Sequence, residues 1–590
     1  MKKYLALFLS LIMLLPFSVV FAEEEFMFSL LPDDVSSLEV DPLNPLSNLV
    51  KGAWYENVKF NDDVTFPVYY YIADGVEVSG KGIIILLDSG IRADAFIASS
   101  GWKEIADKNA VSLIVLESLD GWNEETQAIE RVKKAFSTVK ARHYLCLAGQ
   151  LYNLIAYGDG ATVGMQFAME NHDNFASVVL FGGEAVTEEY VAQMRTVQQE
   201  RKSADLKVPC PVWVFANELT PAVEAEINYW KDANNAGSTC YSNEYADYIY
   251  MPAVVYGYTG LDNENIAQTR LTVGKYVDGV GKEFLQDVYD EFLWIYARHV
   301  GIDAQDLRYF VNPKDSGMEL HTAVVDGIKR YWYVYVPEEI KASGSAVPLV
   351  VAMSGRGGSS STYPSLSKWP QVAGDRGFIC VFPVGSYGRQ LKNGVGNIPM
   401  WGTDSADDVK FLRYMVDDIK ANYNIDAGRV YVSGHSMGCM MSLTASVTLA
   451  DVFTAAAATC ATLPDSALTN QYYSEIYDCP VFISYGEFDY GSFKLAENAG
   501  LQSTFDYYIN RYKLNAIEDA KTYISGPYNH YVFTNDQDVP MFRFTVVQGK
   551  AHGTLPSESY LFYDEFFSRY YRDAEGKLHY METAPVLEIR

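Results

Sequence analysis

The chain has 590 residues, 49% of them hydrophobic, and a formal net charge of −29. This length exceeds what one hydrophobic core usually supports, so at least two domains are expected. The strongly acidic balance excludes nucleic acid and anionic lipid surfaces as expected partners, because both would be repelled.

The first 22 residues, MKKYLALFLSLIMLLPFSVVFA, have the order of a secretory signal peptide, with a basic start, an apolar stretch and a small-x-small end at Ala22. An uncleaved membrane anchor is the alternative, since the apolar stretch is nearly long enough to span a bilayer. Cleavage after Ala22 predicts a secreted protein with no membrane attachment. Residues 23–50 are then expected to form an N-terminal extension.

Seven cysteines are scattered along the chain, without C-x-x-C pairs or histidines at zinc spacing. Secretion permits disulfides, but the odd number leaves at least one thiol unpaired, and burial as small apolar side chains is the favoured interpretation. The sequence therefore predicts neither a metal nor a cofactor.

The N-terminal half alternates short apolar runs with amphipathic stretches, which is typical of a mostly parallel sheet flanked by helices. We expect these elements to form one domain over residues 51–312. The predicted strands are 82–90, 111–118, 144–160, 176–183 and 210–218.

The C-terminal half repeats this pattern, and equivalent residues of the two halves are offset by 265 to 276 positions. A repeat of this length is a whole domain rather than a solenoid unit. We therefore predict an α/β fold built by tandem duplication, with a second domain over 315–575 and a C-terminal tail over 576–590. Its predicted elements are strands at 328–337, 348–355, 378–384, 429–436, 455–462, 480–489 and 543–549, and a helix at 406–423.

The second domain contains the sequence GHSMG at 434–438, a G-x-S-x-G pattern between a predicted strand and a predicted helix. In α/β hydrolases such a sharp strand-to-helix turn presents the serine hydroxyl above the sheet. We therefore predict that Ser436 is a nucleophile, and that the neighbouring His435 points away from the site.

A serine nucleophile needs a histidine to take its proton and a carboxylate to orient that histidine, in the chain order Ser, acid, His. His552 follows a predicted strand and precedes a terminal helical stretch, so it is the candidate base rather than a loop histidine. Asp489 ends the preceding strand and is the candidate acid. Glu487, two residues earlier, is the alternative.

An oxyanion hole needs two backbone N–H groups aimed at the developing negative charge. Met437, directly after the serine, is expected to supply one of them. The other is expected from the loop SGRGGSSS at 354–361, where Arg356 or a neighbouring glycine is the candidate, because glycines allow close approach of the backbone to a substrate.

From about residue 320 to 572 the chain resembles the secreted esterases grouped with polyhydroxybutyrate depolymerases and with feruloyl or acetyl xylan esterases. The similarity rests on DDVKFLRYMVDDIKANYNIDAGRVYVSGHSMGCMMS and, nearer the C-terminus, on YGEFD and KAH. The resemblance implies an α/β-hydrolase fold and the same nucleophile, acid and base as above. The chain departs from the family at Ser354-Gly355, where His-Gly is usual, and at Cys439, where glycine is usual.

The expected function is a secreted serine esterase that acts on acyl or feruloyl groups of plant polysaccharide, or on polyester. Alternatives are a non-catalytic secreted binding protein, a serine peptidase and an acyltransferase. The first domain is predicted to be inactive and to serve as a scaffold, a shield or a binding surface. The offsets place Gly160 opposite Ser436, Thr220 opposite Asp489 and Asp278 opposite His552.

Overall fold

The computed structural model describes residues 38–583 apart from 39, 48, 124, 201–207, 254–265, 299–306, 314, 358–361, 389–397 and 403–406. The predicted signal peptide and much of the predicted extension lie outside these residues. Among the described helices, none combines the length and the apolar character that crossing a bilayer requires.

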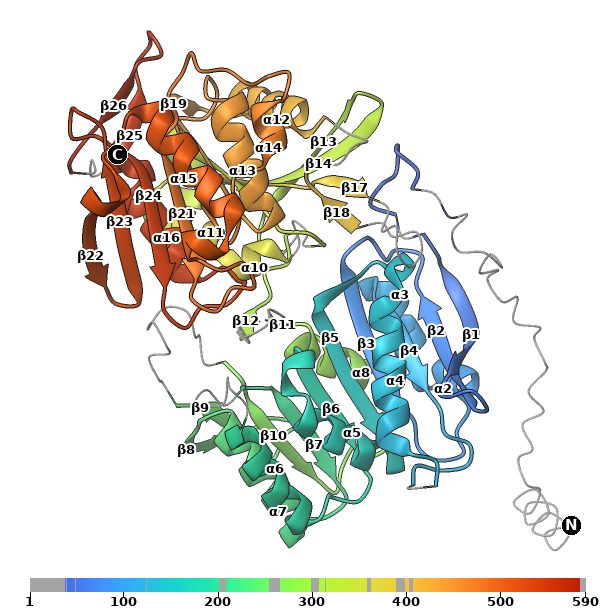
Figure 1. Ribbon diagram of the computed structural model, residues 1–590. Coiled ribbons are helices and arrows are strands. Elements are labelled where there is room, and N and C mark those ends of the chain that lie inside the picture. Colours follow the sequence, from blue (N-terminus) through green and yellow to red (C-terminus); the bar gives the residue numbers. More distant parts are fainter. Residues whose placement is uncertain are drawn as a thin grey trace, which may run out of the picture.

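The first half of the described chain folds around a ten-stranded sheet whose central six strands are parallel (Figure 1). Antiparallel strands extend both edges. In spatial order the strands are β1 (Gly52–Lys59), β2 (Thr65–Ile72), β4 (Ser112–Leu116), β3 (Gly80–Leu86), β5 (Leu147–Tyr157), β6 (Ser177–Phe181), β7 (Val212–Ala216), β10 (Thr269–Val273), β9 (Tyr248–Pro252) and β8 (Ala236–Tyr241).

The second half contains another ten-stranded sheet with the same order and the same parallel centre. Its strands are β13 (Glu319–Val325), β14 (Ile328–Tyr335), β16 (Ile379–Pro383), β15 (Val347–Met353), β19 (Ile425–His435), β20 (Ala455–Thr459), β21 (Val481–Gly486), β24 (Pro540–Val547), β23 (Tyr528–Thr534) and β22 (Lys521–Ser525).

Helices flank each sheet (Figure 1). We call the first sheet with its helices the first unit, and the second sheet with its helices the second unit. Those of the first unit are α2 (Ala93–Ser100), α3 (Trp102–Asn109), α4 (Ala128–Ala141), α5 (Asp159–Glu170), α6 (Glu188–Glu200), α7 (Pro221–Ala233) and α8 (Lys282–Val288). Those of the second are α9 (Glu338–Ser343), α10 (Tyr363–Ser367), α11 (Trp369–Arg376), α12 (Asp408–Asn422), α13 (Met437–Thr448), α14 (Asp465–Leu468), α15 (Ala499–Tyr512) and α16 (Pro556–Glu565). Short ribbons pair β11 (Tyr296–Arg298) with β12 (Leu307–Tyr309), β17 (Ser386–Gly388) with β18 (Ile398–Met400), and β25 (Tyr570–Arg572) with β26 (Leu578–Tyr580).

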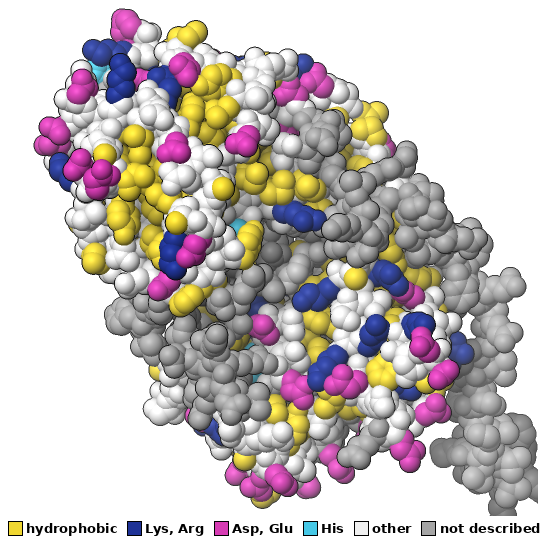
Figure 2. Space-filling view, viewed as in Figure 1, with side chains coloured by type: hydrophobic (Ala, Val, Ile, Leu, Met, Phe, Trp, Pro, Cys, Tyr) yellow, Lys and Arg dark blue, Asp and Glu magenta, His cyan; other side chains and the backbone are white. Residues whose placement is uncertain are grey.

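The central strands are buried on both faces. Every residue of β4, β6, β7, β15, β16, β20 and β21 is buried. Parallel strands covered by helices on both sides carry continuous apolar runs rather than alternating ones, which is why the sequence indicated them. Acidic side chains gather instead on the surface over α6 and α7, for example Glu188 and Glu224 (Figures 1 and 2).

The shared strand order confirms the predicted α/β fold in both halves. A gene duplication remains our interpretation of that order, and the domain boundaries remain predictions. The antiparallel pairs β8–β9 and β22–β23 were not predicted. Strand β26 lies inside the predicted C-terminal tail and pairs with β25.

Candidate active site

Ser436 lies at the sharp turn between β19 and α13, with φ 54° and ψ −117°. Its backbone N–H donates to the carbonyl of Thr459 at 3.0 Å, which fixes the turn to the neighbouring strand. A Cβ atom on Gly434 would lie 2.3 Å from the carbonyl oxygen of Gly438, and one on Gly438 would lie 2.3 Å from that of Met353. The two glycines are therefore required by the crowded backbone that presents the serine.

The structure brings the three predicted catalytic side chains together. His552 Nε2 lies 2.9 Å from Ser436 Oγ, and His552 Nδ1 lies 2.9 Å from Asp489 Oδ1. The Asp489 side chain is 1% exposed and that of His552 is 13% exposed. Glu487 accepts a hydrogen bond from the backbone N–H of Gly549 at 2.9 Å instead, so the geometry favours Asp489 as the acid.

The electrostatics of Asp489 keep it ionised. Burial acts to raise its pKa, but the hydrogen bond and charge of His552, the Cys460 thiol and the Gly491 N–H outweigh burial, so the pKa lies below its ordinary value. An ionised carboxylate accepts a hydrogen bond from the Nδ1–H group of the imidazole. The other nitrogen, Nε2, is then left to accept the proton of Ser436.

A buried ion pair anchors the loop that carries His552. Lys550 donates to Glu558 Oε1 at 2.5 Å, and both side chains are fully buried. Burial acts to lower the pKa of Lys550, but the charge interactions with Cys460 and Glu558 and the hydrogen bond to Glu558 raise it above its ordinary value. Glu558 also accepts the backbone N–H of Leu555 at 2.8 Å, so it ties both sides of the loop to α16. This pair was not predicted, because nothing in the sequence marks a lysine and a glutamate as buried.

Two further side chains contact the base. The Tyr490 hydroxyl lies 2.8 Å from His552 Nε2, so this nitrogen has a second hydroxyl partner besides Ser436. Tyr490 was not predicted as a site residue, although it directly follows the predicted acid. The prediction for His435 is wrong, because its buried ring lies against that of His552 with the centroids 5.0 Å apart.

The strand register shows which residue of the first unit stands opposite the serine. Pairing of β5 with β3, compared with pairing of β19 with β15, places Gly158 opposite Ser436. Gly158 has φ 52° and ψ −130°, the same turn conformation as the serine. The predicted alignment of Gly160 with Ser436 is therefore wrong by two residues. Gly160 corresponds to Gly438, since a Cβ on it would lie 2.4 Å from the carbonyl oxygen of Leu87.

The first unit holds a carboxylate where an oxyanion would bind. Asp88 Oδ1 accepts the backbone N–H groups of Ser89 and Asp159, both at 2.9 Å. By the same register, these two nitrogens correspond to those of Arg356 and Met437 in the second unit. In the first unit the equivalents of the two predicted donors therefore converge on one carboxylate oxygen, and the role of Arg356 and Met437 themselves stays a prediction.

In the second unit the place of Asp88 is taken by Gly355, which has no side chain to fill the hole. A tryptophan fixes the preceding peptide in both units. The indole N–H of Trp401 donates to the carbonyl of Ser354 at 2.8 Å, and that of Trp122 donates to the carbonyl of Leu87 at 2.7 Å. The equivalent peptide is therefore held by a tryptophan in both units, whereas the side chain of Asp88 has no counterpart at Gly355.

The other two positions of the first unit also lack the required chemistry. Thr220 caps α7, where its hydroxyl accepts the N–H of Val223 at 3.2 Å. If α8 is superimposed on α16, the residue equivalent to His552 is Asp278. If β10 is superimposed on β24 instead, the equivalent residue is Gly279. Neither an aspartate nor a glycine offers an imidazole base, so the described residues at these positions do not rebuild the relay.

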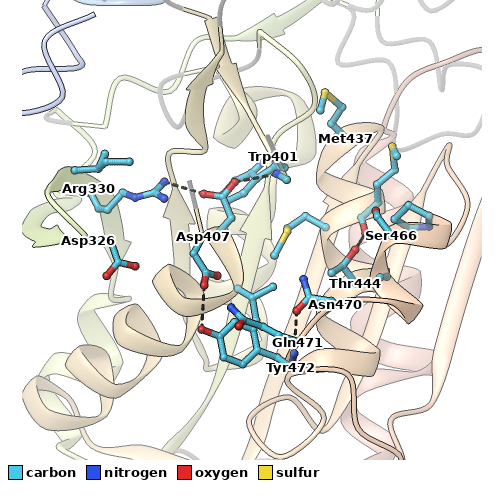
Figure 3. A pocket seen from close by; sticks show the side chains of 18 residues that line it. Asp326, Arg330, Trp401, Asp407, Met437, Thr444, Ser466, Asn470, Gln471 and Tyr472 are labelled. Carbon is cyan, nitrogen blue, oxygen red and sulfur yellow. Dashed lines mark hydrogen bonds and ion pairs between the residues drawn. The ribbon is translucent and has the colours of Figure 1, made fainter. Parts of the chain in front are cut away.

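A pocket of about 580 Å³ includes Met437, the residue after Ser436, in its wall (Figure 3). Its lining includes apolar side chains, among them Trp401 and methionines at 437, 440 and 441. It also includes polar side chains, among them Asp326, Asn470 and Tyr472 (Figure 3). The pocket can therefore contact an apolar group and a hydroxylated group at the same time.

The consecutive aspartates of the DDV sequence build part of this wall. Asp407 caps α12 by accepting the N–H of Lys410 at 2.9 Å, and it accepts the hydroxyl of Tyr472 at 2.9 Å (Figure 3). Asp408 forms a buried ion pair with Arg330 at 2.8 Å. The motif therefore holds β14, α12 and the loop after α14 around the pocket.

Comparison with known proteins agrees with this geometry. Residues 340–522 match the family described as phospholipase/carboxylesterase. The C-terminal unit is carboxylesterase-like. The chain is 26% identical over 253 residues to poly(3-hydroxyalkanoate) depolymerase C of Paucimonas lemoignei, covering 38% of this chain and 58% of that protein. It is also 33% identical over 126 residues to feruloyl esterase B of Neurospora crassa, covering 21% of this chain and 42% of that protein.

A solved structure of acetyl xylan esterase from Aspergillus awamori aligns with 42% of this chain and 98% of its own, with 17% identity and a TM-score of 0.31. The chain spans less than two thirds of the length of the two sequence relatives named above. The resemblance inferred from the sequence is confirmed for this unit.

Proposed function

We propose that the C-terminal unit is a serine esterase that cleaves carboxylic esters through an acyl-enzyme. The observation that carries this proposal is the continuous relay from Asp489 through His552 to Ser436, with both hydrogen bonds at 2.9 Å. Hydrogen bonding of the base to the serine, and of the base to a buried carboxylate, is the arrangement that activates a serine hydroxyl.

The chemistry follows from these contacts. Ser436 Oγ attacks the ester carbonyl carbon while its proton passes to His552 Nε2, and the carbonyl oxygen becomes negative. The N–H groups of Arg356 and Met437 stabilise that oxygen. The intermediate then expels the alcohol, which takes the proton from His552, and the acyl group stays on the serine. Water repeats the sequence, releases the acid and restores Ser436, while Asp489 orients the imidazole throughout.

The pocket supports an ester with one apolar and one hydroxylated part. Methionine and tryptophan side chains line it together with carboxylate, amide and phenol groups. Acidic side chains at Asp326 and Asp407 disfavour anionic substrates, as does the net charge of −29. We therefore propose acyl or feruloyl groups on plant polysaccharide as the substrate, with polyester as the second candidate because of the depolymerase relative.

We also propose that the protein is secreted after cleavage at Ala22, on the strength of the first 22 residues. A binding protein without catalysis is disfavoured by the assembled relay. A peptidase or an acyltransferase would use the same three residues. These alternatives are therefore distinguished by the substrate that the protein turns over, not by the geometry of the site.

A panel of substrates tests the proposal with the full mature chain. Methyl ferulate, acetylated xylan, a polyhydroxybutyrate suspension and a peptide amide would be compared by kcat/KM, with Ser436→Ala as the matched control. We expect hydrolysis of at least one ester and none of the amide. Turnover of the amide alone, or ester turnover that Ser436→Ala retains, would contradict the proposed function.

A further inference from the structure

Cys460 stands directly after β20 in a backbone conformation that favours glycine. Its φ is 67°, and the strand register places it opposite Gly182 of the first unit, which has φ 64°. A residue with a side chain loses free energy in this left-handed region, and such strain concentrates at functional sites. The backbone of this position alone does not explain a cysteine, whereas it does explain the glycine of the inactive unit.

The Cys460 thiol contacts the backbone on both sides of His552. Its sulfur lies 3.3 Å from the carbonyl oxygen of Gly553 and 3.9 Å from that of Ala551, the residues on either side of His552. One potential ligand atom from each of His435, Cys460 and His552 lies within 4.8 Å of the others. His435 and Cys460 are buried, and His552 is half-buried, so three nitrogen and sulfur donors face one another out of bulk water.

We propose that His435, Cys460 and His552 bind a thiophilic divalent cation such as Zn²⁺, and that the bound cation switches off the esterase. Two imidazoles and a thiolate suit Zn²⁺, which bonds these ligands at about 2.0 to 2.3 Å, whereas Mg²⁺ and Ca²⁺ prefer oxygen ligands. Side-chain adjustments that shorten the present separations complete such a site. Binding replaces the thiol proton of Cys460, which passes to the solvent.

Cation binding and catalysis exclude each other at His552. One imidazole nitrogen holds Asp489 and the other holds Ser436, both at 2.9 Å. Coordination through either nitrogen therefore breaks one of the two hydrogen bonds of the relay. The inhibitory effect rests on the proposed function, but binding of the cation does not. The three ligands are far apart in the sequence, so they do not form one of the short Cys and His spacings by which zinc sites are usually recognised.

The first experiment measures inhibition of the chelator-treated full chain by Zn²⁺, with a small ester as substrate and Mg²⁺ as the control cation. The informative variant is Cys460→Gly, because glycine is the residue that this backbone conformation favours and the one that the first unit carries. We expect half-inhibition of this variant, relative to its own basal rate, to require at least ~10-fold more Zn²⁺ than the wild type. Cys240→Ser, which removes the exposed thiol, should keep wild-type sensitivity.

The second experiment detects the cation without turnover. Co²⁺ added to Ser436→Ala should give a cobalt–thiolate charge-transfer absorption that disappears in Ser436→Ala combined with Cys460→Gly. The proposed site is wrong if Cys460→Gly and the wild type are equally sensitive to Zn²⁺, or if the cobalt spectrum does not depend on Cys460. The thiol would then have only a positioning role beside Asp489. If no ester is cleaved but the Cys460-dependent spectrum is present, the proposed function fails and the site stands.

Discussion

In the first unit, the carboxylate of Asp88 lies 2.9 Å from the backbone nitrogen of Asp159, in the place where a reacting oxygen would bind in the second unit. A Cβ atom added to Gly158 would lie 2.1 Å from Asp88 Cγ. The side chain that fills the oxyanion hole therefore also excludes a serine from the nucleophile position. The two losses are structurally coupled.

Introducing a serine at the turn of the first unit tests this coupling. Gly158→Ser should lower the melting temperature, because its Cβ collides with Asp88, and Asp88→Gly combined with Gly158→Ser should recover part of the loss. Neither variant should react with a fluorophosphonate, since no histidine stands opposite His552. Differential scanning calorimetry and labelling on the Ser436→Ala background measure both effects. A labelled residue within 38–298 in either variant would refute the inactivity of this unit.

The choice between two carboxylates can be tested by a matched pair of amides. Asp489→Asn should lower kcat by about 10⁴-fold, because an amide no longer holds the imidazole in the productive tautomer. Glu487→Gln should change kcat little, since its side chain accepts only the Gly549 N–H. Steady-state kinetics on one ester suffices for both. The reverse ranking would transfer the acid role to Glu487.

Removing one member of the Lys550–Glu558 pair should lower the free energy of unfolding more than replacing both members by apolar residues. Lys550→Met leaves Glu558 charged and fully buried, which should destabilise the unit by about 3 to 5 kcal/mol. The double variant Lys550→Met, Glu558→Leu should cost less than either single change, because no buried charge remains unpaired. Chemical denaturation of all three variants gives the comparison. Additive losses would mean that the two side chains are not coupled in the folded state.

Glu226 in α7 should make the first unit less stable as pH rises. Burial raises its pKa to about 8 from an ordinary value of 4.5. A carboxyl group with a raised folded-state pKa contributes stability that is fully present below pH 4.5 and is lost as pH rises through about 8, at about 1.4 kcal/mol per pH unit. Glu226→Gln should therefore raise the melting temperature at pH 8 and change it little at pH 5. The exposed neighbour Glu224→Gln should do neither, and equal effects of the two variants would contradict the burial of this charge.

The sequence was most informative where periodicity and chain order carry the signal. Continuous apolar runs indicated the central parallel strands, and the order serine, acid, histidine along those strands indicated Ser436, Asp489 and His552. The sequence offset placed Gly160 opposite Ser436, two residues from the correct position. The register of β5 and β19 against their neighbouring strands gives the correct equivalence, which is Gly158.

Contacts between distant segments could not be read from the sequence. Cys460 looks like a buried core cysteine until the fold places it behind His552, and Asp88 looks like a loop aspartate until its carboxylate meets two backbone N–H groups. Burial of the Lys550–Glu558 pair contradicts the usual exposure of these residue types, so no pattern predicts it.

The central claim is that Ser436 is the nucleophile that carries the acyl group. Fluorophosphonate labelling of the full mature chain, followed by peptide mass spectrometry, tests it most directly. We predict one adduct, on Ser436, and the loss of both the adduct and at least ~10⁴-fold of kcat in Ser436→Ala. An adduct on any other residue, or near-normal ester hydrolysis by Ser436→Ala, would contradict the claim.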